Sequence, residues 1–471
     1  MGQSAGARFQ RVWEWGLRHQ TAIWIVVIGL LIRYALAIYS AEEDTVTFAA
    51  AAQSMAYGQA PYTYLVLYPP GWVYLLGLLG RSYSLFFGSL SILTVPNGLQ
   101  TLNTIPNAWY ESPYYPSIGF DLYLKSFIFV FDVLSGLLIY CLIRDRVKNP
   151  KIALTGLALW ILNPLVITVS ALHGTYDSIP AFLMLLAYYF STRCDFLYSG
   201  ISLSLGAILK VFPAVLVPVF FVLIWDLAPR QRAAFAKGVL WFMIGFSAVL
   251  CLVFWPPGII SQWLSLFFTG TGRGGEPFGG FNQWSVLTIH GARGLSAFLT
   301  ANADTIIIVT ALEVLLGFGY VAWRTATTLS KSTEDRLGYW DGTFLFAVCL
   351  TYIVVPLVQP QYLIWVMPWL ILVTLVHSAR SALAWGSFTT VTVGVVLFYF
   401  FGLTSPLFFF QPFVLRSHWI GFGVYESSLV QWSKISPNLD PFFQIPVAVA
   451  LAGAGAMGML ISRRYRSPLE S

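Results

Sequence analysis

The chain has 471 residues, of which 57% are hydrophobic and 10% are charged. Soluble domains contain about 25% charged residues, so this composition excludes an ordinary soluble enzyme. The net charge of +6 does not indicate nucleic-acid binding, because the basic residues lie in short connectors between apolar runs. The four cysteines lack metal-ligand spacing, and no disulfide framework is expected.

The apolar runs predict an all-α fold, a polytopic transmembrane helix bundle of about 12 spans, since each span needs roughly 20 apolar residues. The first run follows a polar, arginine-containing N-terminus and lacks an evident cleavage site, which is typical of an uncleaved signal anchor. The expected spans are 22–39, 120–143, 153–171, 178–192, 197–209, 211–225, 238–255, 303–323, 340–357, 361–377, 384–403 and 441–461.

The positive charges predict the orientation of these spans. Of the 26 Lys and Arg residues, 18 lie in every second connector, and connectors rich in basic residues stay in the cytoplasm. Arg193 and Arg230 must then both be inside, so the segment 197–225 has to cross outward and return as two short or broken helices. Lys210 lies at its turn, near the outer face. Both termini are predicted to be cytoplasmic, in a plasma or inner membrane.

We expect one transmembrane domain, 1–471, with three long outer loops at 40–119, 256–302 and 404–440. Each loop is rich in proline and aromatic residues, which is not typical of a disordered linker. Two segments of the first loop, 45–57 and 81–94, are predicted to be helices lying along the membrane interface. The segment Tyr68-Pro69-Pro70-Gly71-Trp72 between them is best explained as the entry to the next helix.

Several polar residues fall on the predicted outer side. Glu42-Glu43-Asp44 is either a solvated acidic cluster or the source of a general base. His173 and Asp177 share a short turn, which is either an ordinary hydrogen-bonded turn or part of a site. Lys210 either reaches the outer surface or pairs with an anion such as phosphate, because an unpaired lysine inside a bilayer is costly. Arg33, inside the first span, poses the same question and has Glu42 as a candidate partner.

The polar landmarks occur in a fixed order over residues 25–370. They are Arg33, Asp44, Gly58-Gln59-Ala60-Pro61-Tyr62, Tyr68-Pro69-Pro70-Gly71, Asn163-Pro164, His173-Gly174-Thr175-Tyr176-Asp177-Ser178-Ile179-Pro180, Leu209-Lys210-Val211-Phe212-Pro213 and Pro360-Gln361-Tyr362-Leu363-Ile364-Trp365. In this order the chain resembles the GT-C superfamily of integral membrane glycosyltransferases, and most closely its polyprenyl-phosphate-mannose-dependent mannosyltransferase-like group. Thr175 departs from the glutamine that is common at this position of the family.

The resemblance implies transfer of a hexose, most simply mannose, from a polyprenyl-phosphate-linked donor to a glycolipid, glycan or protein acceptor, with inversion and on the outer face. It implies Asp44 as the catalytic base. The groups expected to bind the donor phosphate or sugar are Lys210, His173, Asp177, Arg273 and Gln361, with Glu43, Tyr68 and Arg33 as supporting residues. Asp177 is expected either to orient His173 or to bind sugar hydroxyls.

No cofactor is required by this chemistry. Some related enzymes use a divalent metal, and Glu43, Asp44 and Asp177 could supply oxygen ligands for one. The other expected partners are membrane lipids, and no nucleic acid. The main alternative is a polytopic transporter or lipid or glycolipid flippase. Transporters usually show internal repeats, and the sequence shows no such repeat. The ordered polar landmarks also argue against a non-catalytic scaffold.

Overall fold

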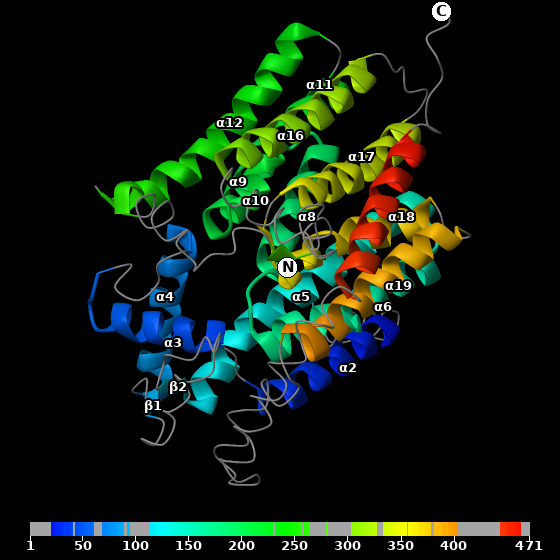
Figure 1. Ribbon diagram of the computed structural model, residues 1–471. Coiled ribbons are helices and arrows are strands. Elements are labelled where there is room, and N and C mark those ends of the chain that lie inside the picture. Colours follow the sequence, from blue (N-terminus) through cyan, green and yellow to red (C-terminus); the bar gives the residue numbers. More distant parts are fainter. Residues whose placement is uncertain are drawn as a thin grey trace, which may run out of the picture.

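The computed structural model describes residues 20–40, 43–60, 68–88, 92–94, 114–228, 231–255, 258–262, 279–280, 303–326, 333–355, 357–377, 381–403 and 443–462. Within these ranges the chain is almost wholly helical, and the helices form a bundle with α3 and α4 set to one side (Figure 1). The all-helical prediction is therefore confirmed. Arg273 and most of the two later outer loops lie outside the described residues.

Eight helices in the described ranges are long and apolar enough to cross a membrane, which confirms a multi-pass membrane protein. The third of them is continuous from α6 through α7 into the π-helix η2, and the seventh continues from α19 into the π-helix η4. The eight are α2 (Gln20–Ala37), α5 (Ile118–Val147), α6 (Pro150–Ile161) with α7 (Pro164–Ile167) and η2 (Thr168–His173), α12 (Arg232–Phe254), α16 (Ala303–Ala326), α17 (Thr333–Val354), α19 (Ala382–Leu397) with η4 (Phe398–Leu403), and Phe443–Ser462.

Four shorter apolar helices correspond to the remaining predicted spans. They are α8 (Ser178–Thr192), α9 (Phe196–Leu209), α11 (Val217–Leu227), and the 3-10 helix η3 (Pro360–Trp365) with α18 (Met367–Val376). Every predicted span thus has a helical counterpart. Because these four are shorter than the roughly 20 residues of a full crossing, the count of twelve spans stays a prediction.

The break that was predicted within 197–225 is present at Lys210. This residue has extended backbone angles and ends α9, and the short helix α10 (Phe212–Val215) follows at once, with Pro213 in its first turn. Proline lacks an N–H group, so it fits the first turn of a helix better than its interior. The break places Lys210 at the site described below.

The helices of the first outer loop differ from their predicted bounds. The segment 45–57 corresponds to α3 (Glu43–Ala56), as expected. The predicted helix 81–94 is wrong, because the helix there, α4 (Pro70–Phe87), begins at Pro70 and ends before Gly88, whose φ of 95° favours glycine. Strand β1 (Ile92–Thr94) follows and pairs antiparallel with β2 (Tyr114–Pro116). A second minimal pair, β3 (Gly279–Gly280) with β4 (Leu357–Val358), is parallel.

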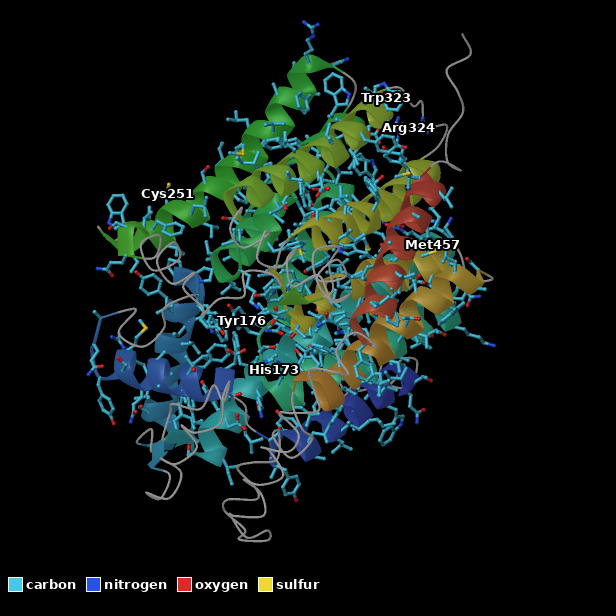
Figure 2. The ribbon with its side chains drawn as sticks, in the orientation of Figure 1. His173, Tyr176, Cys251, Trp323, Arg324 and Met457 are labelled. Atoms are coloured by element: carbon cyan, nitrogen blue, oxygen red, sulfur yellow. The ribbon has the colours of Figure 1, made fainter. Side chains whose placement is uncertain are left out.

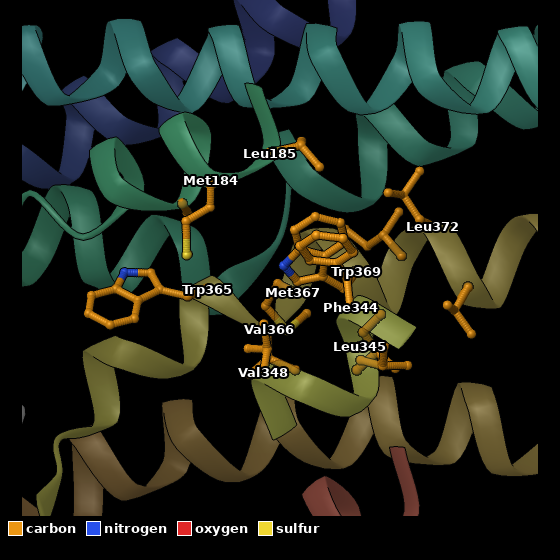
Figure 3. Close-up of a cluster of buried hydrophobic side chains, with 14 of the residues drawn as sticks. Met184, Leu185, Phe344, Leu345, Val348, Trp365, Val366, Met367, Trp369 and Leu372 are labelled. Carbon is orange, nitrogen blue, oxygen red and sulfur yellow. The ribbon is translucent and has the colours of Figure 1, made fainter. Parts of the chain in front are cut away.

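The main core lies where α8, α17 and α18 meet, and Figure 3 shows its aromatic and aliphatic side chains interlocking. Trp369 stacks on Phe344 with ring centroids 4.8 Å apart, and Tyr188 meets Trp369 edge-on at 5.1 Å. Such pairs each stabilise the folded state by about 0.5–1.5 kcal/mol beyond the area they bury. Lipid tails are as apolar as this core, so tight packing of this kind is what holds membrane helices together.

A cluster of charged groups ties the same three helices to α5. The Arg146 guanidinium donates to both oxygens of Asp341, at 2.7 and 3.1 Å, and the Tyr188 hydroxyl donates to Asp341 at 2.6 Å. His377, at the end of α18, lies 3.0 Å from the same carboxylate. We call these four residues the Asp341 cluster. It lies at the ends of α5 and α18 that are predicted to face the cytoplasm.

Glycines let α9 and α12 approach at backbone distance. A Cβ on Gly245 would come within 3.0 Å of the Ile201 N atom and would collide with the Leu197 carbonyl oxygen. Gly200 faces the Phe242 carbonyl in the same way. Small residues at such crossings are the usual solution in membrane bundles.

Replacing Gly245 by Ala is therefore expected to destabilise the protein by about 1–3 kcal/mol, the cost typical of overpacking. Gly319→Ala is the matched control, since a Cβ at Gly319 meets nothing within 4 Å. Alanine there should be neutral or stabilising, because it is the better helix former. Thermal unfolding of the two variants in detergent checks this, and an unchanged Tm for Gly245→Ala would contradict the packing argument.

Candidate active site

The predicted outer-side residues converge on one region, at the ends of several helices. Asp44 lies in the first turn of α3, His173 ends η2, Asp177 precedes α8, and Lys210 separates α9 from α10. Figure 2 shows His173 and Tyr176 close together near the centre of the molecule. Helix ends expose backbone polar groups and side chains that regular helices keep apart, which suits them to build a site.

Asp44 is held by two contacts, one on each carboxylate oxygen. The Tyr68 hydroxyl donates to Oδ1 at 2.6 Å, and His173 Nε2 lies 3.3 Å from Oδ2. The Asp44 side chain is 25% exposed, whereas that of His173 is 8% exposed. Burial and the Asp44 charge hold the pKa of the Tyr68 phenol well above its usual range, so Tyr68 remains a donor. Asp44 is thus an oriented carboxylate that a substrate can reach.

The local backbone explains how His173 reaches Asp44. The π-helix η2 ends at Gly174, whose φ of 75° is left-handed and suits glycine. A Cβ at Gly174 would come within 2.6 Å of Thr45 Oγ1 and 2.9 Å of Lys125 Cε, so a larger residue would also clash. Thr45 donates to the His173 carbonyl at 3.2 Å and thereby joins α3 to this turn.

Lys210 forms the second centre of the site. Its ammonium lies 2.7 Å from Asp177 Oδ1, with side-chain exposures of 11% for Lys210 and 0% for Asp177. The rings of Tyr362 and Tyr176 surround it at 4.2 and 5.0 Å. Burial alone would lower the pKa of Lys210, but attraction to Asp177 and their hydrogen bond raise it above its usual range. The group is therefore a fixed cation at all physiological pH values.

Tyr176 lies between the two centres. Its ring stacks on Trp72 at 3.7 Å, lies 5.9 Å from the Tyr68 ring and is one wall around Lys210. Its hydroxyl donates to the Leu209 carbonyl at 3.1 Å, directly before Lys210. The carboxylate of Asp44 also contributes to the potential at Lys210. The base candidate and the cation therefore belong to one site with an aromatic wall.

The far side of His173 contacts a residue that the sequence did not reveal. His173 Nδ1 lies 3.0 Å from the Tyr399 hydroxyl, which donates to Gln361 Oε1 at 3.2 Å. Gln361 Nε2 in turn donates to Gln359 at 2.6 Å. Gln361 was expected to bind the donor directly, whereas here it supports Tyr399. A tyrosine inside an apolar run carries no distinctive signal, so Tyr399 could not be singled out.

Three further expectations have separate outcomes. Glu42, the suggested partner of Arg33, lies outside the described residues. Arg33 Nε lies 2.7 Å from Asp132 on α5, and its Nη1 donates to the Ile161 carbonyl. These contacts do not connect it to Asp44. Glu43 begins α3, but its side chain and that of Arg273 lie outside the described part of the chain. Asp177 does not orient His173, because its carboxylate is turned to Lys210 and the carboxylate beside His173 is Asp44.

The arrangement of carboxylates does not fit a divalent metal. Asp177 already faces the Lys210 ammonium, and the Asp44 oxygens face Tyr68 and His173. Among the described residues, no three His, Cys, Asp or Glu side chains converge to hold an ion. A metal site needs several such oxygens directed at one point. In the described part of this site the positive charge comes from the Lys210 ammonium, and the carboxylate oxygens already have partners.

Comparison with known proteins finds similarity over part of the chain. Residues 122–340 match glycosyltransferase family 87. The chain is 31% identical over 129 residues to GPI mannosyltransferase 1 of Kluyveromyces lactis, which is 27% of this chain and 30% of that protein. It is 29% identical over 91 residues to the enzyme of the same name from Saccharomyces cerevisiae, 19% of this chain and 22% of that protein.

A third relative, GPI mannosyltransferase 1 of Candida albicans, is 30% identical over 95 residues, 20% of this chain and 24% of that protein. The aligned parts span less than a third of the length of each of these curated relatives. The family match includes the turn of His173 and Asp177 and the helix break at Lys210. Over residues 122–340, just under half of its length, the chain is therefore similar to glycosyltransferase family 87.

Proposed function

We propose that this protein transfers a hexose, mannose in the first instance, from a polyprenyl-phosphate-linked donor to a hydroxyl of a lipid, glycan or protein acceptor. The observation that carries the proposal is the pairing of a reachable, oriented carboxylate, Asp44, with a fixed buried cation, Lys210, across the Tyr176 ring. The match to glycosyltransferase family 87 over residues 122–340 supports glycosyl transfer, and the names of the yeast relatives support mannose.

Asp44 acts in this proposal as the general base. A sugar phosphate carries its own leaving group, so the reaction needs a base for the acceptor hydroxyl but no separate acid. Direct attack by that hydroxyl on C1 inverts the anomeric centre, through an oxocarbenium-like transition state. A retaining mechanism would need a second carboxylate free to act as nucleophile. Asp177 is fully buried against Lys210 and does not meet that need.

Lys210 stabilises the departing phosphate. An ammonium has three N–H donors, and in the described structure one of them bonds to Asp177. Charge grows on the phosphate as its bond to C1 breaks, and a cation already in place stabilises it without reorganisation. His173, Asp177 and the region of Arg273 remain proposed contacts of the donor.

The site is proposed to face the outer side of a plasma or inner membrane, with both termini and the connector at Arg193 in the cytoplasm and twelve spans in all. The basic connectors carry this assignment. Helices α3 and α4 would lie at the outer interface, where the exposed Leu85, Phe86 and Phe87 side chains enter lipid. The segments 40–119, 256–302 and 404–440 would together cover the acceptor side of one domain.

Replacing Asp44 by Asn is expected to lower kcat by at least about 100-fold, because it removes the base and leaves the Tyr68 contact possible. The measurement is sugar transfer from a synthetic polyprenyl-phosphate-mannose donor by protein in liposomes. Asp145→Asn is the matched control, since Asp145 is an exposed partner of Arg193 and such pairs contribute little. A rate near that of the wild type in Asp44→Asn would remove Asp44 as the base.

Replacing Lys210 by Gln is expected to weaken donor binding by roughly 10- to 100-fold, the range for losing a charge-assisted hydrogen bond of about 1.5–3 kcal/mol. Because this leaves Asp177 buried without its partner, the double variant Lys210→Gln, Asp177→Asn separates folding from binding. Lys151→Ala, an exposed lysine on the predicted cytoplasmic side, is the control. Donor affinity unchanged in both Lys210 variants would move the phosphate site elsewhere.

Reporter fusions after residue 195 and at the C-terminus are both expected to report a cytoplasmic location, because the basic connectors flanking these points stay inside. A fusion within residues 95–113 should report the outer side. Alkaline phosphatase and green fluorescent protein fusions give opposite signals on the two sides and therefore check each other. An outer signal at residue 195 would contradict the twelve-span arrangement.

A further inference from the structure

A chain of side-chain contacts leads from Asp44 away from the substrate side. His173 follows Asp44, with Nε2 3.3 Å from Oδ2. Next come Tyr399, whose hydroxyl is 3.0 Å from Nδ1, and Gln361, which accepts from that hydroxyl. The chain joins α3, η2, η4 and η3, and Tyr399 and Gln361 lie beyond His173 as seen from Asp44.

The direction of these hydrogen bonds decides which nitrogen of His173 carries a proton. The Gln361 amide donates through Nε2 to Gln359, which leaves its Oε1 to accept from Tyr399. A phenol has one proton to donate. Since Tyr399 gives it to Gln361, its oxygen must accept from His173, and Nδ1 carries hydrogen. In neutral His173 the Nε2 atom then carries no hydrogen, and its lone pair is directed at Asp44.

Two lone pairs, on Nε2 and on Asp44 Oδ2, face each other at 3.3 Å in that arrangement. Their contact becomes attractive when one proton lies between them. A protonated Asp44 donating to Nε2 meets this condition, and so does an imidazolium donating to an ionised Asp44. A proton therefore stabilises the structure when it lies between Asp44 Oδ2 and His173 Nε2.

From this geometry we infer that His173 is a proton-holding partner of Asp44, and that Tyr399, supported by Gln361 and Gln359, is the positioning residue that keeps Nε2 unprotonated to receive it. The inference rests on the proposed function and deepens it. It reassigns His173 from binding the donor phosphate to accepting the proton that the acceptor loses.

The step balances in atoms and charge. The acceptor O–H bond breaks as its oxygen bonds to C1 of the sugar, and the proton moves to Asp44, where it is shared between Oδ2 and His173 Nε2. The C1–O bond to phosphate breaks with its electron pair on the phosphate oxygen. The stored proton passes to water or to the released phosphate monoester as the products leave, which restores Asp44 for the next turnover.

Other charged and titratable groups face this turn from each neighbouring element. Lys210, between α9 and α10, belongs to the same site and is paired with Asp177 at 2.7 Å. Lys125 of α5 lies against Gly174 and is paired with Asp121 at 3.1 Å. Tyr68 and Asp44 contribute from the α3–α4 side. A positive charge nearby disfavours a second one on the imidazole ring. The proton is therefore stored as Asp44–H directed at Nε2.

Tyr399→Phe tests the inference. It keeps the ring but removes the acceptor for Nδ1–H, and a buried N–H without a partner is costly. His173 is then expected to adopt the other tautomer, with Nε2–H donating to Asp44 and stabilising its ionised form. Asp44 becomes a weaker base. We expect kcat to fall roughly 10- to 100-fold, the acid limb of the kcat–pH profile to move to lower pH, and donor KM to stay within about twofold.

His173→Gln is the second variant, because an amide can donate to Asp44 but cannot take up a proton. It should show the same lower kcat and the same direction of shift. Tyr339→Phe is the matched control, since it removes another buried tyrosine hydroxyl, bonded to Thr325 at 2.7 Å between α16 and α17. Its kcat and pH profile should equal those of the wild type.

Each outcome decides a different point. An unshifted acid limb in both Tyr399→Phe and His173→Gln would overturn the proton-holding role, whatever happens to kcat or Tm. A raised donor KM at unchanged kcat in His173→Gln would also overturn it and return His173 to the phosphate site. Wild-type transfer that does not depend on Asp44 would instead overturn the proposed function, so failure of the two proposals can be told apart.

Discussion

The buried ion pair between Lys210 and Asp177 is the interaction on which the arrangement of the site depends. It joins the break after α9 to the start of α8, and the Trp365 indole donates to the Asp177 carbonyl at 2.9 Å, which adds η3 to the same point. Removing one partner of such a pair leaves a buried charge uncompensated and costs about 3–5 kcal/mol. Three segments distant in sequence are therefore fixed relative to one another by one contact.

The other buried charges have a structural role, because both members of each ion pair are buried. Arg33 with Asp132, and Arg146 with Asp341, are ion pairs whose side chains are at most 7% exposed, within long helices. In each pair the two charges neutralise each other inside the bundle, and their side chains have almost no surface that a substrate could contact. Asp44 differs, because a quarter of its side chain is open. Among these acids, the accessible one is suited to act on a ligand, and the buried ones hold helices together.

Much of this could be predicted from the sequence, because prolines, glycines and charges mark where helices end in a membrane protein. The break at Lys210 and the turn of His173 were located in this way, and the side chains of helix ends then met in space as expected. Partners were harder to assign. Arg33 has a nearby acid in sequence, yet it pairs with Asp132, 99 residues away, because its position on α2 directs it into the bundle.

The same limit explains why Tyr399 and the true bounds of α4 were missed. Tyr399 comes 226 residues after His173, and only the packing of η4 against η2 brings them together. The amphipathic pattern of 81–94 combined the end of one helix with part of a strand, and periodicity alone does not show where a helix begins. Pro69-Pro70 was the better signal, since it does start α4.

The Asp341 cluster has a consequence for the site at the other end of the same helices. On α8, Tyr188 of the cluster follows Asp177 of the site by 11 residues, which is about 16 Å along the helix. On α18, His377 of the cluster is at the end of the helix, and Trp365 of the site comes just before its start. Both helices are thus anchored at each end and form a rigid frame around the cation. The cost of orienting Lys210 and its aromatic neighbours is met once, during folding, so binding energy from a long lipid donor remains for the reacting sugar.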